Sequence, residues 1–285
     1  MRVVCLILAV SGLLFVLPAT RADGVMNFTY AQVSGVDDPH LPYMQALLQL
    51  ACDKAKTRCA SRPALDMNQS RALTQMQKKD SGLDLFWGMT SRRREELALP
   101  VRVPLYKGLI GWRVALVTDA HSQLLAKVKT RTDLAAFHAG QAEDWPDTGI
   151  LRNAGLPVLT TNDYGNLIPM LRHGRYDYFP RSVIEVRQEV RSAAAKGLII
   201  DDHIAIHYPA AFYFFVSRHR PELASMLDSG LKAAVADGSF NQLFMRFNGE
   251  AIRELKLAKR VVIELDDPLL PEATPLEDKR LWFQP

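Results

Sequence analysis

The sequence predicts an α/β fold in which largely parallel sheets are flanked by helices. Two observations support this class. Short β-branched or aromatic runs alternate with amphipathic segments along most of the chain, as strands and crossover helices do. In addition, the stretch from Gly174 to Ser182 has the pattern of a helix end, an aromatic strand and a polar strand end.

The first half of the chain supplies three short strands and two helices. Leu41, Met44, Leu47, Leu48 and Ala51 recur at helical spacing, so we expect a helix over residues 41–58. A second helix begins at a cap provided by residue 68 or 70 and ends near residue 79. Strands are expected at 25–33, 61–67 and 83–87, and extended segments at 97–106 and 109–118.

The second half continues the alternation and then changes character. Thr132 or Asp133 caps one expected helix, two more cover 145–154 and 164–173, and strands near Val158 and Tyr176 fall between them. After residue 201 we expect an aromatic strand at 211–217 and helices over 221–236 and from Ser239. The proline-rich, acidic tail ends in apolar residues 281–283, which predicts that it docks on the body.

The stretch 174–182 also suggests a binding group. Gly174 stands where a helix would end in a left-handed residue. Pro180 lacks a donor for a ladder and is expected to close the strand. Arg181 would then emerge at the carboxyl end of the strand, where open α/β sheets bind ligands.

The N-terminus predicts export. Met1-Arg2 is a positive start, Val3 to Leu17 is almost continuously apolar, and Ala22 is a small residue at an expected cleavage point. Residues 1–22 therefore resemble a secretory signal peptide, which places the mature protein in the periplasm. The alternative is an uncleaved membrane anchor, although the apolar run is shorter than the ~20 residues of a spanning helix.

Charge gives little reason to expect nucleic acid as a partner. Cleavage would remove Arg2 and Arg21, so the formal net charge would fall from +4 to +2. Acidic and basic residues are interspersed, and the dense basic run 92–94 is followed at once by Glu95 and Glu96. A polyanion ligand is therefore not predicted.

Cys52 and Cys59 remain after the predicted cleavage, and an even count in an oxidising compartment favours a disulfide. Two positions seven residues apart in one helix would be about 10 Å apart, too far to bond. The bond therefore requires the helix to end before Cys59. Free buried thiols are the alternative.

Several short motifs, in this order, carry a resemblance to a known family. They are Gly88-Met89-Thr90-Ser91-Arg92-Arg93 after a buried strand, Pro104-Leu105-Tyr106, Gly174-Arg175-Tyr176-Asp177, the run 212–218, Pro221-Glu222 and Asp237-Gly238. The chain resembles type 2 periplasmic solute-binding proteins of family 3, which are related to the polar amino-acid receptors of ABC transporters. Residues 145, 147, 178–182 and 281–285 are similar to a poorly characterised branch of that family.

The resemblance implies a two-lobed clamshell with a mixed, mostly parallel sheet in each lobe. Lobe one would comprise residues 23–112 and 216–262, lobe two residues 113–215, and the docking tail residues 263–285. A ligand would bind between the lobes and favour the closed form. The implied partners are a small-molecule ligand and an inner-membrane permease or membrane-bound sensor, and we expect a monomer.

In relatives of this type a Thr-x-x-Arg motif grips the α-carboxylate of the ligand. The matching residues here are Thr90 and Arg93, and a hydroxyl with a guanidinium fork suits a carboxylate. The alternative is that Thr90 merely caps a helix that carries solvated arginines.

The expected second lobe departs from the family. Amino-acid receptors usually carry an acid for the ligand ammonium a few residues after Gly-Arg-x-Asp, whereas this chain has Arg181-Ser182. The usual Gly-Ser/Thr anchor is replaced by Gly140-Gln141, which makes Gln141 a candidate contact. Glu143 and Asp144 follow and either favour a helix dipole or receive a cationic group.

Aromatic residues complete the predicted site. Tyr30, Trp87 and Tyr178 each fall near the carboxyl end of an expected strand, where a side chain can face the cleft, although core packing is the alternative for each. His203 and His207 would be about 13 Å apart in a strand, so no metal site is predicted. No cofactor is expected either.

No motif for nucleophilic, metal or phosphate chemistry stands in a defined context, so the protein is not predicted to be an enzyme. The sequence favours a periplasmic protein that binds a small, carboxylate-bearing solute. A sensory or adaptor clamshell that engages a membrane partner is the alternative, and a small periplasmic lyase is a third possibility.

Overall fold

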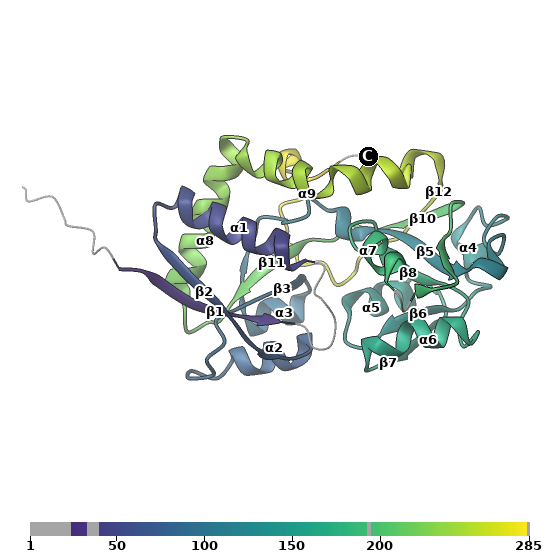
Figure 1. Ribbon diagram of the computed structural model, residues 1–285, viewed down its shortest axis with the longest axis horizontal. Helices are drawn as coiled ribbons and strands as arrows, with labels where there is room; N and C mark the ends of the chain where they lie inside the picture. Colours follow the sequence, from purple (N-terminus) through teal and green to yellow (C-terminus); the bar gives the residue numbers. More distant parts are fainter. Residues whose placement is uncertain (1–23, 33–39, 193–194, 284–285) are drawn as a thin grey trace, which may run out of the picture.

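The computed structural model describes residues 24–32, 40–192 and 195–283. These residues form two lobes that lie side by side along the long axis of the molecule (Figure 1). The predicted signal peptide and the loop 33–39 lie outside the described residues. Within the described ranges, no helix combines the length and apolar character that crossing a membrane requires.

Lobe one is built on a five-stranded sheet of order β2-β1-β3-β11-β4. Its strands are β1 (Met26–Gln32), β2 (Cys59–Asp66), β3 (Leu85–Met89), β4 (Leu99–Val101) and β11 (Phe212–Val216). The pairs β1–β2 and β1–β3 are parallel, whereas β11 is antiparallel to both β3 and β4. Every residue of β3 and β11 is buried, as expected for central strands covered on both faces.

Lobe two is built on a second sheet of order β12-β10-β5-β8, with β9 paired to the far end of β5. Its strands are β5 (Trp112–Thr118), β8 (Phe179–Ser182), β9 (Leu198–Ile200), β10 (Ile204–His207) and β12 (Val261–Glu264). Only β10–β12 is parallel in this sheet. Both large sheets are mixed, as predicted, but antiparallel pairs are more frequent than we expected.

A small parallel sheet of β6 (Ala139–Ala142) and β7 (Val158–Thr161) adjoins the second sheet through a bridge from Ala139 to Tyr178. The described residues of this lobe include the α-helices α4 (Arg131–Leu134), α5 (Pro146–Asn153), α6 (Leu167–Arg172) and α7 (Val186–Arg191). Gly174 has φ +65° just after α6, which confirms the predicted left-handed helix end.

Helices α1 (Leu41–Lys54), α2 (Gln69–Met76), α3 (Arg92–Leu97) and α8 (Pro221–Ala236) surround the first sheet (Figure 1). Helix α1 ends four residues earlier than predicted, and Lys56 takes a left-handed φ of +52° in the turn that follows. The turn brings Cys59, the first residue of β2, back to Cys52 with a Cα–Cα distance of 6.2 Å. The predicted disulfide joins them.

Two strands lie in different lobes from those we expected. The predicted boundary at 215/216 falls inside β11, all of which pairs with β3 of lobe one. Strand β12 was assigned in part to lobe one but extends the sheet of lobe two through β10. In both cases the hydrogen-bonded partner, which the local sequence does not reveal, decides the lobe.

The prediction for Pro180 was also wrong. Pro180 does not close a strand: it lies inside β8 opposite Ala115, and Arg181 follows opposite Val114 within the same strand. Among the named strands β8 pairs on one side only, with β5, so the missing N–H of a proline is tolerated there.

Helix α9 (Ser239–Leu255) and the tail connect the lobes. Helix α9 runs along one edge of the molecule above both lobes (Figure 1), and Glu250 and Glu254 lie 3.2 and 2.6 Å from Arg187 of α7. The tail leaves β12 in lobe two and returns, so that the N–H of Phe283 donates to the carbonyl of Lys107 at 2.7 Å.

Candidate functional site

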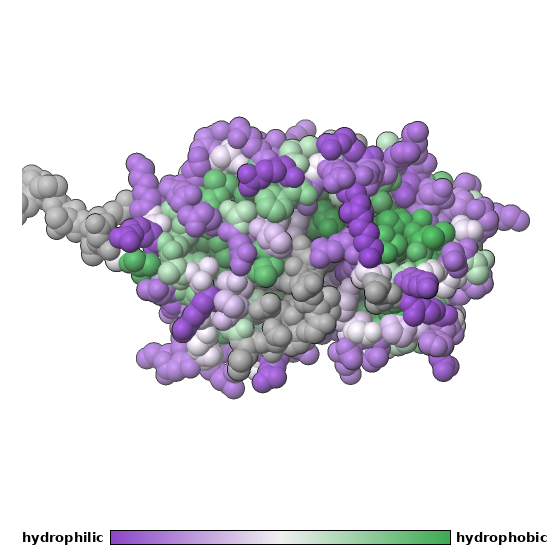
Figure 2. All heavy atoms as spheres, in the orientation of Figure 1, coloured by the Kyte–Doolittle hydropathy of each residue, from purple (hydrophilic) through white to green (hydrophobic). Residues whose placement is uncertain are grey.

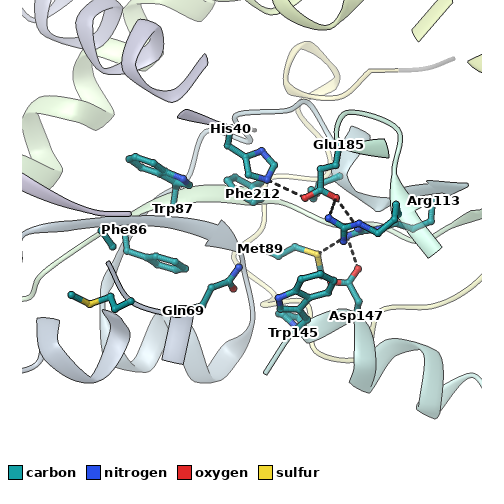
Figure 3. A pocket seen from close by; sticks show the side chains of 15 residues that line it. His40, Gln69, Phe86, Trp87, Met89, Arg113, Trp145, Asp147, Glu185 and Phe212 are labelled. Atoms are coloured by element: carbon teal, nitrogen blue, oxygen red, sulfur yellow. Dashed lines mark hydrogen bonds and ion pairs between the residues drawn. The ribbon is translucent and has the colours of Figure 1, made fainter. Parts of the chain in front are cut away.

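A cavity of about 70 Å³ lies between the lobes. Its wall on the side of lobe one is apolar and aromatic, and Trp145 adds an aromatic face from lobe two (Figure 3). The main apolar residues of the lining are Met67, Phe86, Trp87, Met89, Trp145 and Phe212. This volume is well below the ~300–1,000 Å³ of typical small-molecule pockets, so the lobes lie close together across the cleft.

The opposite end of the cavity is polar and charged. Glu185 and Asp147 stand on either side of Arg113, and His40 reaches Glu185 from lobe one (Figure 3). Arg181 completes this end of the lining. All four charged residues are buried. A buried charge is costly unless it is paired. The partners of these four side chains therefore determine which charges remain for a ligand to bind.

Arg181 is paired twice. Its Nε donates to both carboxylate oxygens of Glu189 at 2.9 and 2.8 Å, and its Nη2 lies 3.1 Å from Glu185. The guanidinium also lies over the ring of Trp145, 4.7 Å from its centroid. Burial alone would lower the pKa of Arg181, but Glu185 and Glu189 outweigh it and raise that pKa well above its ordinary value.

Glu185 is held ionised by the same network. Burial opposes its charge, but Arg181, His40 and Arg113 together hold the pKa of Glu185 well below its usual range. Its oxygens lie 3.0 Å from His40 Nε2 and 3.5 Å from Arg113. Glu185 is therefore already paired with cationic groups of the protein and does not need a cation from a ligand.

Arg113 has its own acid. Its Nη2 lies 2.5 Å from Asp147 Oδ1, which also accepts a hydrogen bond from the hydroxyl of Tyr208. Burial would lower the pKa of Arg113, but Asp147, Tyr208 and Glu185 raise it above the ordinary value. Arg113 and Arg181 are therefore neutralised from within the protein.

Arg94 differs from these two arginines. It is the third buried arginine, with 5% exposure, and no described carboxylate lies within 4.0 Å of it. Its guanidinium donates to the carbonyl of Met89 at 2.8 Å, to Gln69 Oε1 at 2.7 Å and to the carbonyl of Asp144 at 3.2 Å. Burial lowers the pKa of Arg94 to about 10, although the charges of Asp144 and Asp147 act in the opposite direction, so Arg94 remains a cation at neutral pH.

Local structure explains why Arg94 points inward. Ser91 caps α3 by accepting from the N–H of Arg94 at 3.3 Å, which fixes the phase of the helix. Gly88 leaves room for the guanidinium, since a Cβ there would lie 2.9 Å from Arg94 Nη1. Glu95 accepts from Thr90 at 2.8 Å and pairs with Arg102, so it does not neutralise Arg94.

The lobes meet through their own side chains as well as across the cavity. Ser70 of α2 donates to Asp144 Oδ2 at 3.1 Å, and Arg94 reaches the backbone of the same residue. His40 joins lobe one to Glu185, and its Nδ1 lies 2.7 Å from the hydroxyl of Tyr106. The structure is thus a closed clamshell.

Of the seven predicted ligand contacts, Trp87 and Arg181 line the cavity and five do not. Thr90 is buried and donates to Glu95, whereas Arg93 is exposed on the outer face of α3. The neighbouring Arg94, which we did not predict, lies behind the cavity wall instead. The signal that could have identified it is Ser91 as the cap, since Ser91-x-x-Arg94 repeats the expected spacing one residue later.

The other three predicted contacts are packed within the lobes. The ring of Tyr30 lies 5.1 Å from that of Trp87, and its hydroxyl accepts from Gln45 at 3.0 Å. Gln141 and Tyr178 are fully buried, and both Gln141 Oε1 and the Tyr178 hydroxyl are without a hydrogen bond partner in the described chain. Burial raises the pKa of Tyr178, so this hydroxyl stays protonated.

Among the residues that the structure describes, one group of potential metal ligands occurs elsewhere in lobe two. Atoms of Asp201, Asp202 and His203 lie within 4.8 Å of one another. The Asp201 carboxylate, however, already accepts from the N–H groups of His203 and Ile204, both at 3.0 Å, and lies 2.8 Å from His203 Nδ1. This cluster closes the turn before β10.

No family model and no curated protein matches the sequence. Solved structures do match. The VFT2 domain of Bordetella pertussis BvgS has a TM-score of 0.59 and 16% identity, with 78% of this chain and 93% of that one covered. GshT of Streptococcus mutans, described with glutathione import through a cystine ABC importer, has a TM-score of 0.57 and 14% identity over 79% and 96%.

An arginine-specific periplasmic binding protein of Salmonella typhimurium has a TM-score of 0.55 and 14% identity, with 79% of this chain and 99% of that one covered. The chain has the fold of a type II periplasmic solute-binding protein. The predicted resemblance is thereby confirmed at the level of the fold.

Proposed function

We propose that this protein is an exported solute-binding protein that captures a small, carboxylate-bearing solute between its lobes. The observation that carries the proposal is Arg94, a buried guanidinium without a described carboxylate partner, directly behind the cleft wall. A ligand carboxylate would supply the charge that the other two buried arginines receive from the protein.

The surroundings of Arg94 suggest how the carboxylate would enter. Gln69 lines the cavity and occupies Arg94 Nη2 with its amide oxygen, while its amide nitrogen donates to no described residue. A ligand carboxylate can take the place of the Gln69 oxygen, and a turned amide would then donate to it. Opening of the lobes would release the contact from Arg94 to Asp144, because these residues belong to different lobes.

Arg94→Gln tests the proposal, with Arg93→Gln as the matched control on the same helix. Truncating one member of a buried, hydrogen-bonded charge pair costs about 2–5 kcal/mol, or roughly 30-fold to a few thousand-fold in affinity. Isothermal titration with a panel of small carboxylates should show this loss for Arg94→Gln and unchanged affinity for Arg93→Gln. Equal affinity in both variants would contradict the role of Arg94, provided that circular dichroism shows both to be folded.

A sensory or adaptor role is the second candidate, favoured by the closed form of the lobes. Protein contacts such as His40–Glu185 and Ser70–Asp144 join the two lobes directly and would favour closure. A clamshell that is already closed responds to a ligand only if the ligand distinguishes its two states. Small-angle scattering of the ligand-free protein tests this: a closed particle that no solute alters favours a membrane-bound sensor over a permease as partner.

The predicted signal peptide places either function in the periplasm. Mass spectrometry of protein purified from that compartment should find Asp23 as the first residue. Retention of residues 1–22 with membrane association would favour the anchor instead. The disulfide between Cys52 and Cys59 is consistent with the oxidising compartment that export implies.

A further inference from the structure

The carboxylates of the cleft are already engaged, which restricts the ligands that fit. Glu185, Asp147 and Glu189 each accept from at least one buried arginine, Arg113 or Arg181. A zwitterionic amino acid brings an ammonium group that needs an acceptor with a negative charge. Among the described residues that line the cavity, no carboxylate is left without a cation.

The positive charges at this end of the cleft add to the restriction. Arg113 and Arg181 both line the cavity and both are more than nine-tenths buried, so solvent screens them poorly. Arg181 also covers faces of Trp145 and Phe179, with its guanidinium carbon 4.7 and 4.9 Å from the two ring centroids. These faces are therefore not available to hold the cation of a ligand.

The rest of the lining is suited to hydrocarbon. Phe86, Trp87, Met89 and Phe212 give the cavity a largely apolar wall near Gln69 (Figure 3). Arg94 does not line the cavity but donates to Gln69, which does. An apolar ligand body can cover this wall while its carboxylate meets Arg94. Asp144, the acid nearest to Arg94 across the cleft, turns its side chain to Ser70 and does not line the cavity.

Resting on the proposed function, we infer that the cleft selects a monocarboxylic acid with an apolar body and rejects the α-amino acid of the same shape. The ligand class follows from three features of the described residues: a buried guanidinium with no carboxylate within 4.0 Å, a largely apolar wall, and cleft carboxylates that are all paired with cations. The small space in the closed form favours a short-chain body or a partly opened cleft.

Matched ligand pairs provide the test. Propionate and alanine, 4-methylvalerate and leucine, and 3-phenylpropionate and phenylalanine differ within each pair only by the α-ammonium group. Titration calorimetry on the mature protein should give at least tenfold tighter binding of the des-amino member of any pair that binds. Equal or tighter binding of the amino acid would overturn this inference and leave solute capture intact. If none of the six compounds bound, both this inference and the proposed solute capture would be overturned.

A variant of the charge network tests the cause. Arg181→Gln leaves Glu185 and Glu189 without their main cation, so the variant should gain affinity for the amino acid and reduce the preference at least tenfold. An unchanged preference in the folded variant would overturn the role of Arg181. The wild-type comparison decides the ligand class by itself if the variant does not fold.

Discussion

Replacement of Arg181 by Met should destabilise the protein strongly, because the structure makes this arginine part of the core of lobe two. The variant keeps the length and apolar stem of the side chain but removes the guanidinium. Glu189 and Glu185, whose side chains are 8% and 9% exposed, would then be buried without their strongest partner. The loss is therefore larger than that of a surface ion pair.

The contacts indicate the magnitude. Arg181 makes a two-pronged contact with Glu189 and a further one with Glu185, and removal of one partner of a buried ion pair typically costs about 3–5 kcal/mol. Arg187→Met is the matched control. Arg187 pairs with Glu250 and Glu254, which are largely exposed, so we expect a loss of at most about 1 kcal/mol.

Urea denaturation followed by circular dichroism measures both losses. The deficit of Arg181→Met should also shrink between pH 7 and pH 5, because Glu185 loses the guanidinium that lowers its pKa and can then take up a proton and lose its buried charge. A deficit below about 1 kcal/mol at pH 7, equal to that of the control, would refute the assignment of Arg181 to a buried structural network.

Three further predictions concern stability. Asp267→Asn should stabilise the protein at pH 7.5 by about 1–2 kcal/mol and leave it unchanged near pH 3.5. Burial raises the pKa of Asp267 to about 6 from an ordinary 3.8, so the penalty of its buried charge appears as pH rises through that window. Urea midpoints of both proteins across this range measure the difference. Gly230→Ala should lower the free energy of unfolding by about 1–3 kcal/mol, because a Cβ would lie 2.0 Å from the carbonyl oxygen of Ala51 where α8 meets α1. An unchanged urea midpoint would show that the two helices can move apart at no cost. Replacing Cys52 and Cys59 together by Ser should lower stability by about 2–3 kcal/mol, the value for a loop of about eight residues, measured by the same method without reductant.

The sequence was sufficient for the alternation of strands and helices, the left-handed end at Gly174 and the disulfide. These features depend on local patterns: periodicity, a glycine that tolerates positive φ, and the short turn after α1. The lobe to which β11 and β12 belong depends on pairing with strands more than 50 residues away, and no local pattern encodes that choice.

The candidate site was harder to predict, for a geometric reason. Arg92, Arg93 and Arg94 are successive residues of one short helix and point about 100° apart from one another, so only the phase set by Ser91 decides which one is buried. The partners of Arg181 were missed for a similar reason. They lie four and eight residues later, in a different element, where strand spacing predicts no contact.

The C-terminal tail has a mechanical consequence for the hinge. The carbonyl of Leu269 accepts from the N–H of Arg92 in lobe one at 3.2 Å, while its side chain packs over Gly149 in lobe two. Leu269 therefore contacts both lobes at a place separate from the short segments that connect the two sheets. Any swing of the lobes must break one of these two contacts, so a chain cut after Asp266 should open with less resistance. A segment that belongs to neither sheet therefore contributes to the stiffness of the joint.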